Sequence, residues 1–323
     1  MTAGERPDQV AEDVAGPMDG ATRADAAVPA DRATLGGVPL DGIALADAMA
    51  AIETACERRR PLRIVTVNLN FVTLARRHEP FRTALRTADL ATVDGRIMLW
   101  LLRLAGHRAP EQVTGHDLVR EVVVRGAGRG WRIFLLGGGP GVAERVAARL
   151  EREHRGLTVR GTDGGRFSPE GATDRQAEVE AMIRGLDPHV ILVALGAPKQ
   201  DLWLARHLET VAPAVGIGLG GVFDTLAGDL PRAPRWMQVA GLESLFQLLK
   251  RPRRYARRYL LDDPPTLVRL LAECLDRRAR GSGGGDDGGR GRDGGRGTGR
   301  GAGADGAGDG DRVSPSRRAS AAR

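Results

Sequence analysis

Asp94 closes the short apolar run ADLATVD at residues 88–94 and is followed at once by Gly95. A carboxylate at the end of a strand, beside a glycine that leaves room for a ligand, can serve as a general base, a metal ligand or a turn residue. Asp89, near the start of the same run, is better explained as a helix-to-strand turn residue. The role of Asp94 depends on which other residues the fold brings to the same place.

Short apolar runs rich in Val, Ile and Leu recur along the chain, as expected of strands that are buried on both faces. We expect strands at residues 63–68, 88–94, 131–138, 157–162, 189–196 and 214–221. Helical patterns separate them: Val142, Val146 and Leu150, for example, recur at four-residue steps. This alternation predicts an α/β fold, a parallel sheet with helices on both faces.

In a parallel α/β sheet, ligands bind at the carboxyl ends of the strands. Residues that could bind or react lie at or just beyond the predicted strand ends: Asn68, Asp94, Gly137, Gly138, Gly139, Gly196, Gly220 and Asp224. Their coincidence predicts one site at this edge of the sheet.

The segment FLLGGGPGVAE at residues 134–144 has the order strand, glycine-rich turn, helix. Glycines let the backbone approach a diphosphate closely, and the free N–H groups at the start of a helix favour an anion. The spacing of Gly137, Gly138 and Gly139 fits neither the dinucleotide fingerprint nor the P-loop. A nucleotide-binding role and an ordinary turn therefore both remain open for these glycines.

Two further loops follow predicted strands. In GAPKQDLW, at residues 196–203, Gln200 lies in the first turn of a predicted helix and could bind a sugar hydroxyl or a phosphate, or be an ordinary surface glutamine. The segment GLGGVFDTLAGDLPRAP, at residues 218–234, has too many glycines for a simple strand end. A binding loop is expected there, with Asp224 for ribose or sugar hydroxyls and Arg232 for phosphate.

The Asp-x-Asp pair that often holds the catalytic metal of nucleotide-sugar enzymes is absent from residues 34–280 and occurs only as Asp309 and Asp311. We therefore expect a metal-independent site with no cofactor. Asp94 then fits best as a general base whose pKa depends on its cleft.

The composition divides the chain into four segments. Residues 1–33 and the Gly/Arg/Asp-rich residues 281–323 are expected to be disordered, because they cannot bury enough apolar surface to offset their ordering entropy. Residues 34–235 form the predicted α/β domain. Residues 236–280 carry no strand pattern and predict two or three helices, the last of them starting after the capping pair Asp262–Asp263.

A basic run, KRPRRYARRY, occupies residues 250–259 of a chain whose net charge is +7. It favours an anionic partner: phosphate, nucleic acid or an acidic membrane surface. Together with the apolar helix face before it, this run predicts a membrane-docking appendage, with a helical cap on the sheet as the alternative. No signal peptide or membrane span is apparent, and Cys56 and Cys274 suggest no disulfide framework, so we expect a cytoplasmic protein, peripheral on the inner face of the plasma membrane.

Several segments, taken in order, resemble the WecG/TagA/CpsF family of glycosyltransferases over nearly all of residues 35–260. They are TVN (66–68), DG (94–95), VTGHDL (113–118), FLLGGGPGVAE (134–144), GAPKQD (196–201), GGVFDTLAGDLPRAPRWMQVAGLESL (220–245) and the RPRRYARRYL ending. The resemblance implies a metal-independent, inverting transfer of an N-acetylmannosamine-type or related hexose from a UDP-sugar to a polyprenyl-diphosphate-linked sugar, in cell-surface polysaccharide synthesis. It also implies a Rossmann-like domain with a C-terminal helical appendage that docks on the membrane.

The resemblance assigns roles to single residues. Asp94 matches the family's catalytic base, and Thr66, Asn68 and Gln200 match polar residues of its sugar pocket. The appendage arginines, expected to neutralise a substrate diphosphate, are matched by Arg254, Arg257 and Arg258. The chain departs from the family in the segment LESLFQLL, where Ser244 and Gln247 stand in place of the usual tryptophan and arginine.

An Arg/Gly-rich nucleic-acid-binding protein without transferase activity is the main alternative, since the tail and the basic run would attract a polyanion. The tail lacks the interleaved aromatic residues that provide stacking platforms, so we expect no specific nucleic acid as a partner. A nicotinamide dehydrogenase is disfavoured by the missing fingerprint. Apolar surface on the appendage could also serve a contact between subunits, and a homo-oligomer therefore stays open.

Overall fold

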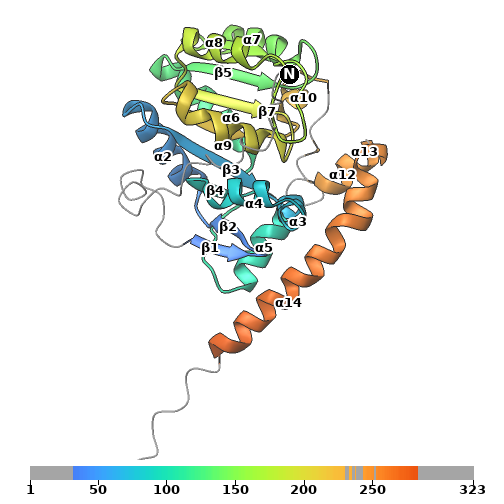
Figure 1. The fold of residues 1–323 in the computed structure, drawn as a ribbon. Coiled ribbons are helices and arrows are strands. Elements are labelled where there is room, and N and C mark those ends of the chain that lie inside the picture. Colours follow the sequence, from blue (N-terminus) through green and yellow to red (C-terminus); the bar gives the residue numbers. More distant parts are fainter. Residues whose placement is uncertain (1–31, 230–232, 235–236, 238–242, 251, 283–323) are drawn as a thin grey trace, which may run out of the picture. The chain divides into compact units, whose positions relative to one another are not determined.

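The computed structural model describes residues 32–229, 233–234, 237, 243–250 and 252–282. An eight-stranded sheet, with the strand order β1-β2-β4-β3-β8-β7-β5-β6, runs through the middle of the described chain (Figure 1). The strands are β1 (Arg32–Leu35), β2 (Val38–Asp41), β3 (Leu62–Val67), β4 (Leu90–Val93), β5 (Arg132–Gly137), β6 (Thr158–Thr162), β7 (Val190–Ala194) and β8 (Val215–Gly218).

The helices that flank the sheet fall between these strands. They are α2 (Leu45–Glu57), α3 (Leu69–Ala75), α4 (Glu79–Arg86), α5 (Arg96–Leu104), α6 (Gly115–Arg129), α7 (Val142–Glu153), α8 (Gln176–Leu186), α9 (Lys199–Val211) and α10 (Val222–Leu226). The C-terminal helices are α12 (Glu243–Lys250), α13 (Pro252–Arg257), the π-helix η1 (Arg258–Asp262) and α14 (Asp263–Ser282).

All strands expected from the sequence are present. Apart from the pairing of β1 with β2, every strand of the sheet pairs parallel with its neighbours in the order given above, from β2 at one side to β6 at the other. The α/β fold class is therefore confirmed. Successive side chains along a strand point to opposite faces of the sheet. Ile133 packs in a cluster with α2, α6 and α7, whereas the next residue, Phe134, packs in a cluster with α8 and α9.

The hairpin of β1 and β2 was not expected from the sequence. Its strands pair antiparallel, and Gly36 and Gly37 form the turn with φ angles of 59° and 79°. Two consecutive residues with positive φ are the requirement of a tight hairpin turn, which explains the two glycines. The first strand, β1, begins at Arg32.

A buried ion pair holds this hairpin to the sheet. The Asp41 carboxylate is fully buried and accepts hydrogen bonds from Arg32 Nε at 3.0 Å, from Arg32 Nη2 at 2.8 Å and from the Ala91 amide of β4 at 2.7 Å. The carboxylate thus joins three strands. A buried charge is tolerated only with such full pairing, because taking it out of water is costly.

We expect Asp41→Asn to lower the free energy of unfolding by about 3 kcal/mol, because the substitution leaves Arg32 without its anionic partner. Urea unfolding measures this loss as a lower midpoint at an unchanged slope. Asp187→Asn is the matched control: Asp187 pairs with Arg132 at 2.7 Å, but its side chain is 58% exposed, so a change below about 1 kcal/mol is expected. Equal losses in both variants would contradict this account of the hairpin.

The sequence predicts a last helix that starts after the capping pair Asp262–Asp263, but α13, η1 and α14 follow one another without a break from Pro252 to Ser282, and Asp263 has helical φ and ψ angles of −78° and −36°. This helix, α14, begins at Asp263 and carries Pro264 and Pro265 in its first turn. Its Leu270 and Cys274 are buried in one apolar cluster with residues of α3 and α5. One face of α14 therefore packs on the α/β domain, as expected of the helical cap that the sequence left as an alternative. Among the described helices, none combines the length and the apolar character needed to cross a bilayer.

Candidate active site

The strand order brings the predicted site residues to neighbouring strand ends. Across the sheet, β4, β3, β8, β7 and β5 are followed by Asp94, Asn68, Gly220, Gly196 and Gly138, respectively. These residues are far apart in the sequence and come together only because all five strands run parallel. This is the edge of an open α/β sheet at which ligands bind.

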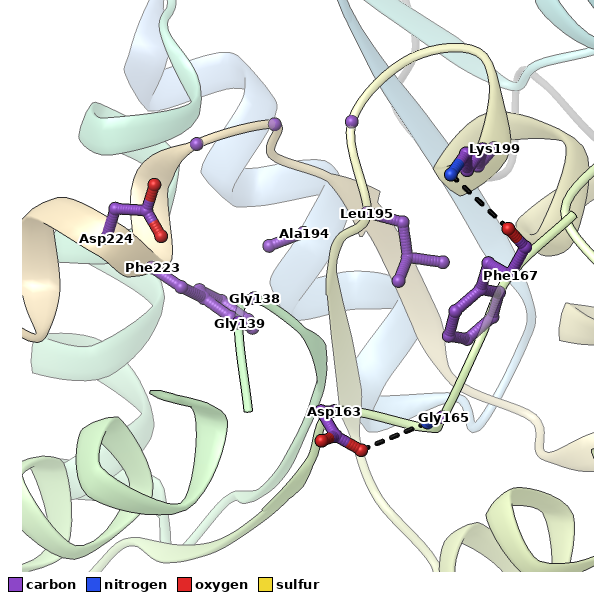
Figure 2. A pocket seen from close by; sticks show the side chains of 13 residues that line it. Gly138, Gly139, Asp163, Gly165, Phe167, Ala194, Leu195, Lys199, Phe223 and Asp224 are labelled. Carbon is purple, nitrogen blue, oxygen red and sulfur yellow. Dashed lines mark hydrogen bonds between the residues drawn. The ribbon is translucent and has the colours of Figure 1, made fainter. Parts of the chain in front are cut away.

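Two cavities open at this edge and share Gly196, Gly220, Gly221 and Asp224 in their linings. The larger one, of about 410 Å³, is lined by most of the residues predicted for substrate binding and catalysis: Thr66, Asn68, Asp94, Gln200 and Arg258. The smaller one, of about 330 Å³, is lined by Gly138 and Gly139 (Figure 2).

Backbone contacts fix Asp94 at the mouth of the larger cavity. Its amide donates to Val67 O of β3 at 2.9 Å, so the residue stays registered with the neighbouring strand. Gly95 follows with a φ of 100° and caps the N-terminus of α5. This backbone conformation is open to glycine but strained for other residues, and it turns the chain away directly behind the half-buried Asp94 side chain. A base at a rigid turn meets the positioning requirement of proton transfer.

Asp89 has the structural role expected from the sequence. Its carboxylate accepts a hydrogen bond from the Arg63 amide at 2.7 Å, at the start of β3. Burial raises the pKa of Asp89, and this hydrogen bond and the charge of Arg63 partly offset the rise. Asp89 and Asp94 therefore belong to opposite ends of β4, and Asp94 alone of the pair lines the larger cavity.

Thr66 and Asn68 lie at the C-terminal end of β3. The buried Thr66 hydroxyl donates to Gly218 O of β8 at 3.1 Å, which leaves its oxygen able to accept a hydrogen bond. Asn68 precedes α3, and its Oδ1 accepts from Arg258 Nη2 at 3.3 Å. Asn68 therefore links the α/β domain to the C-terminal helices at the edge of the cavity.

Gln200 lines the larger cavity and also holds two of its loops together. Its side chain is buried, and its Oε1 accepts hydrogen bonds from the Gly196 amide at 3.1 Å and the Gly220 amide at 2.8 Å. One carboxamide oxygen thus ties the loops after β7 and β8 together. Burial excludes the ordinary surface glutamine that the sequence left open, and binding of a sugar or phosphate by this side chain stays a prediction.

Asp201, the next residue, was not singled out by its sequence position. It is fully buried, and neither carboxylate oxygen has a hydrogen bond of good geometry. It packs against Gly218, where an added Cβ would lie 2.9 Å from Oδ1. Burial raises the pKa of Asp201 to about 7, and the charge of Arg63 opposes this rise. The carboxyl group is therefore protonated in the folded protein over a wide acidic range.

We expect Asp201→Asn to become progressively more stable than wild type as the pH rises from 4 to 7. In this window the unfolded wild-type chain releases the Asp201 proton but the folded protein keeps it, so wild type loses stability with rising pH. The gain is at most about 4 kcal/mol, because each tenfold difference in proton affinity between the two states corresponds to about 1.4 kcal/mol. Urea unfolding across this pH range measures it, and a constant difference between the two proteins would contradict the prediction.

The C-terminal helices contribute a cation and two aromatic rings to the larger cavity. Tyr255, Arg258 and Tyr259 line it, and the two tyrosine rings stack with centroids 5.7 Å apart. The Arg258 guanidinium lies 4.9 Å from the centroid of Tyr259. An arginine at a half-buried cavity wall is suited to a phosphate or diphosphate, which it can bind through two parallel hydrogen bonds.

The other predicted arginines differ from Arg258. The Arg257 side chain is 83% exposed, pairs with Asp262 at 3.6 Å and lines neither cavity. The predicted residue Arg232 lies outside the described residues, as do the side chains of Arg254, Ser244 and Gln247. Gly137 also lines neither cavity; it ends β5, and its neighbour Gly138 donates an amide hydrogen bond to Ala194 O at 3.0 Å.

The smaller cavity is also lined by Asp163 and Phe167, which the sequence did not single out, and by Lys199 in the first turn of α9. Figure 2 shows Phe167 and Lys199 on one side and Asp224 on the other. Lys199 Nζ donates to Phe167 O at 3.3 Å, and Asp163 Oδ1 accepts from the Gly165 amide at 3.0 Å. A ring, an ammonium group, two carboxylates and exposed glycine backbone form a set suited to a nucleotide.

The fold and these cavities define an α/β enzyme with its site at the carboxyl ends of parallel strands. The chain belongs to the glycosyl transferase WecG/TagA/CpsF family, whose sequence model matches residues 33–280, and it is therefore a glycosyltransferase. This confirms the resemblance seen in the sequence and favours the transferase over the nucleic-acid-binding alternative.

A curated relative adds the chemistry of one member. The chain is 28% identical over 210 residues to the N-acetylglucosaminyldiphosphoundecaprenol N-acetyl-beta-D-mannosaminyltransferase of Bacillus subtilis (strain 168). The alignment covers 65% of this chain and 79% of the relative. By its name, the relative transfers an N-acetylmannosaminyl group to a sugar carried on undecaprenyl diphosphate.

Proposed function

We propose that this glycosyltransferase moves a hexose, of the N-acetylmannosamine type or a related one, from a UDP-sugar to a sugar linked to polyprenyl diphosphate. The observation that carries the proposal is that Asp94 and Arg258 line one cavity, which shares a wall of glycine loops with a second. A base and a cation are thus within one pocket, beside a pocket of nucleotide character. The named activity of the Bacillus subtilis relative supports the choice of donor and acceptor class.

The smaller cavity is the proposed site of the donor nucleotide. Gly138, Gly139, Gly196 and Gly220 present backbone to the ligand without side chains in the way, so a diphosphate can approach the loops closely. Asp224 lies on the wall that both cavities share, where a hydroxyl of the ribose or of the donor sugar would be in reach. The donor sugar would then extend from this wall toward Asp94.

The larger cavity is the proposed site of reaction. Asp94 removes the proton from an acceptor hydroxyl while that oxygen attacks the anomeric carbon of the donor. The carbon–oxygen bond to UDP breaks at the same carbon on the opposite face, and its electron pair leaves with the diphosphate. One displacement of this kind inverts the configuration. Arg258 stabilises the charge that develops on the leaving group.

We further propose that the reaction needs no metal ion. The support is the sequence, in which the α/β domain and the appendage lack the Asp-x-Asp pair. Within the described part of the chain, no cluster of three or more histidine, cysteine or acidic side chains has a metal-binding arrangement. In this proposal the arginine takes the role that a divalent cation has in other nucleotide-sugar enzymes.

The acceptor's lipid requires access to a membrane, which we assign to the C-terminal helices. Leu261, Val268 and Leu275 are exposed and recur at seven-residue spacing, so they form one stripe along η1 and α14. The basic run at residues 250–259 precedes this stripe. Apolar side chains beside arginines suit the interface of an anionic bilayer. In the proposed arrangement the enzyme is peripheral on the cytoplasmic face.

The proposal is tested with a panel of UDP-sugars and a short-chain polyprenyl-diphosphate-linked N-acetylglucosamine acceptor. The expected result is UDP release that requires the acceptor and continues in excess EDTA, with one donor strongly preferred. Release that stops in EDTA and returns with added magnesium would overturn metal independence alone. A folded protein that turns over none of the donors would overturn the proposed substrates.

A further inference from the structure

A buried carboxylate lies behind the one described arginine that lines the larger cavity. Asp263, the first residue of α14, is 4% exposed, and its Oδ2 is 3.4 Å from Arg258 Nε. Its other oxygen, Oδ1, accepts a hydrogen bond from the Thr73 hydroxyl of α3 at 2.9 Å. Thr73 is buried as well. The carboxylate therefore joins an arginine of the C-terminal helices to a helix of the α/β domain.

The π-helix makes the contact between Arg258 and Asp263 possible. In an α-helix, residues five positions apart do not share a face, and pairs form at three or four positions. Here the Asp263 amide donates to Arg258 O in the wider turn of η1, which brings residues five apart to the same side. A single π-helical turn is an uncommon feature that is found most often at functional sites.

Three contacts fix three parts of the Arg258 side chain. Its Nε faces Asp263, its Nη2 donates to Asn68 Oδ1 at 3.3 Å, and its guanidinium lies against the Tyr259 ring. A free arginine side chain samples many rotamers, and ordering it on binding costs free energy. A guanidinium that is held in advance avoids this cost when a diphosphate arrives.

We propose that Asp263 and Thr73 are positioning residues: Thr73 anchors the Asp263 carboxylate, which orients the Arg258 guanidinium toward the larger cavity for a substrate diphosphate. This inference rests on the proposed function, because that function supplies the diphosphate. Thr73 has a second acceptor within reach, Leu69 O at 3.1 Å, but one hydroxyl donates a single proton. The ionised carboxylate is the stronger acceptor of the two and keeps the hydroxyl directed at Asp263.

The test compares Asp263→Asn and Thr73→Val with a matched control in the same interface. Thr266 is also buried and accepts a hydrogen bond from Arg76 Nη1 at 3.3 Å, so it too joins α14 to the end of α3. Thr266→Val removes this contact without touching Arg258. We expect kcat/KM to fall about tenfold or more for Asp263→Asn, less for Thr73→Val, and no more than about twofold for Thr266→Val. Thr73→Ser, which keeps the hydroxyl, should restore the wild-type value.

A double-mutant cycle separates positioning from simple structural support. If Asp263 acts through Arg258, Asp263→Asn costs no more than about twofold in a protein that already carries Arg258→Ala. Equal losses from Asp263→Asn in both backgrounds would overturn the proposal, as would an equal loss from Thr266→Val. Crystal structures give a readout that does not depend on turnover. An ordered Arg258 side chain in the Asp263→Asn protein would also overturn the positioning proposal. Wild-type protein that turns over none of the donors would overturn the proposed function instead.

Discussion

Asp94→Asn is expected to lower kcat about 10³-fold and to leave the affinity for UDP unchanged. The amide has the shape of the carboxylate but accepts no proton, so the acceptor hydroxyl would have to attack while still protonated. Asp94 lines the larger cavity and not the smaller one, which is why nucleotide binding should be spared. Steady-state release of UDP gives the first quantity, and calorimetric titration of UDP into the variant gives the second.

Asp163→Asn is the matched control for this experiment. Asp163 lines only the smaller cavity and is also partly exposed, so the same change of charge is made at the nucleotide side of the site. A kcat close to that of wild type is expected for this variant. If Asp94→Asn retained wild-type kcat, the family and the cavity would stand, but the base would have to be a different residue.

Arg258→Ala is expected to lower kcat/KM about 10²-fold or more, the second of the large effects. The guanidinium is the cation that the described structure places in the wall of the larger cavity, and its loss leaves diphosphate charge without a partner there. Arg258→Lys should restore only part of the activity, because an ammonium group lacks the planar fork that contacts a phosphate and Asp263 together. The kcat/KM of both variants is measured with a short-chain acceptor in detergent, where no bilayer contributes to binding.

Arg257 provides the control for Arg258. It is its neighbour in sequence and carries the same charge, but it is exposed and lines neither cavity. Arg257→Ala should therefore stay within about threefold of wild type in the detergent assay. Equal loss in the two variants would show that the net charge of the basic run matters, and not the position of one guanidinium, and would contradict the account of the site.

Much of this site was accessible from the sequence because the relevant signals are local. A Val/Ile/Leu run that ends in a polar or glycine residue predicts both a strand and its ligand-binding end, and Asp94, Asn68 and Gly196 all follow this rule.

Features that depend on pairing between distant segments could not be predicted this way. Phe167 and Lys199 meet only because residues after β6 return beside the start of α9. The double use of Gln200 Oε1 depends on β7 and β8 being neighbours, which no local pattern reveals. The β1–β2 hairpin is the exception, since the pair Gly36–Gly37 between apolar residues is a local hairpin signal that was overlooked.

Asp263, in the C-terminal helices, is a second residue whose contact with a distant segment could not be predicted from the sequence. The sequence predicts a helix cap at this position, whereas the structure places Asp263 inside a continuous helical segment and shows that its carboxylate contacts Thr73 across 190 residues of chain. This long-range contact appears only in the folded protein. The link from Thr73 to Arg258 joins the capping helix to the cavity, so packing of α14 and the chemistry of the site are connected through one buried carboxylate.

The central claim, a single displacement with Asp94 as base, is tested most directly by the configuration of the new glycosidic bond. The enzyme is incubated with an α-linked UDP-sugar, chosen as its best donor, and the lipid acceptor, and the disaccharide product is released and examined by NMR. The account predicts a β-linked product only, because one attack from the face opposite UDP inverts the anomeric carbon. An α-linked product would contradict it, because retention requires a second displacement or a front-side attack that a lone base does not provide.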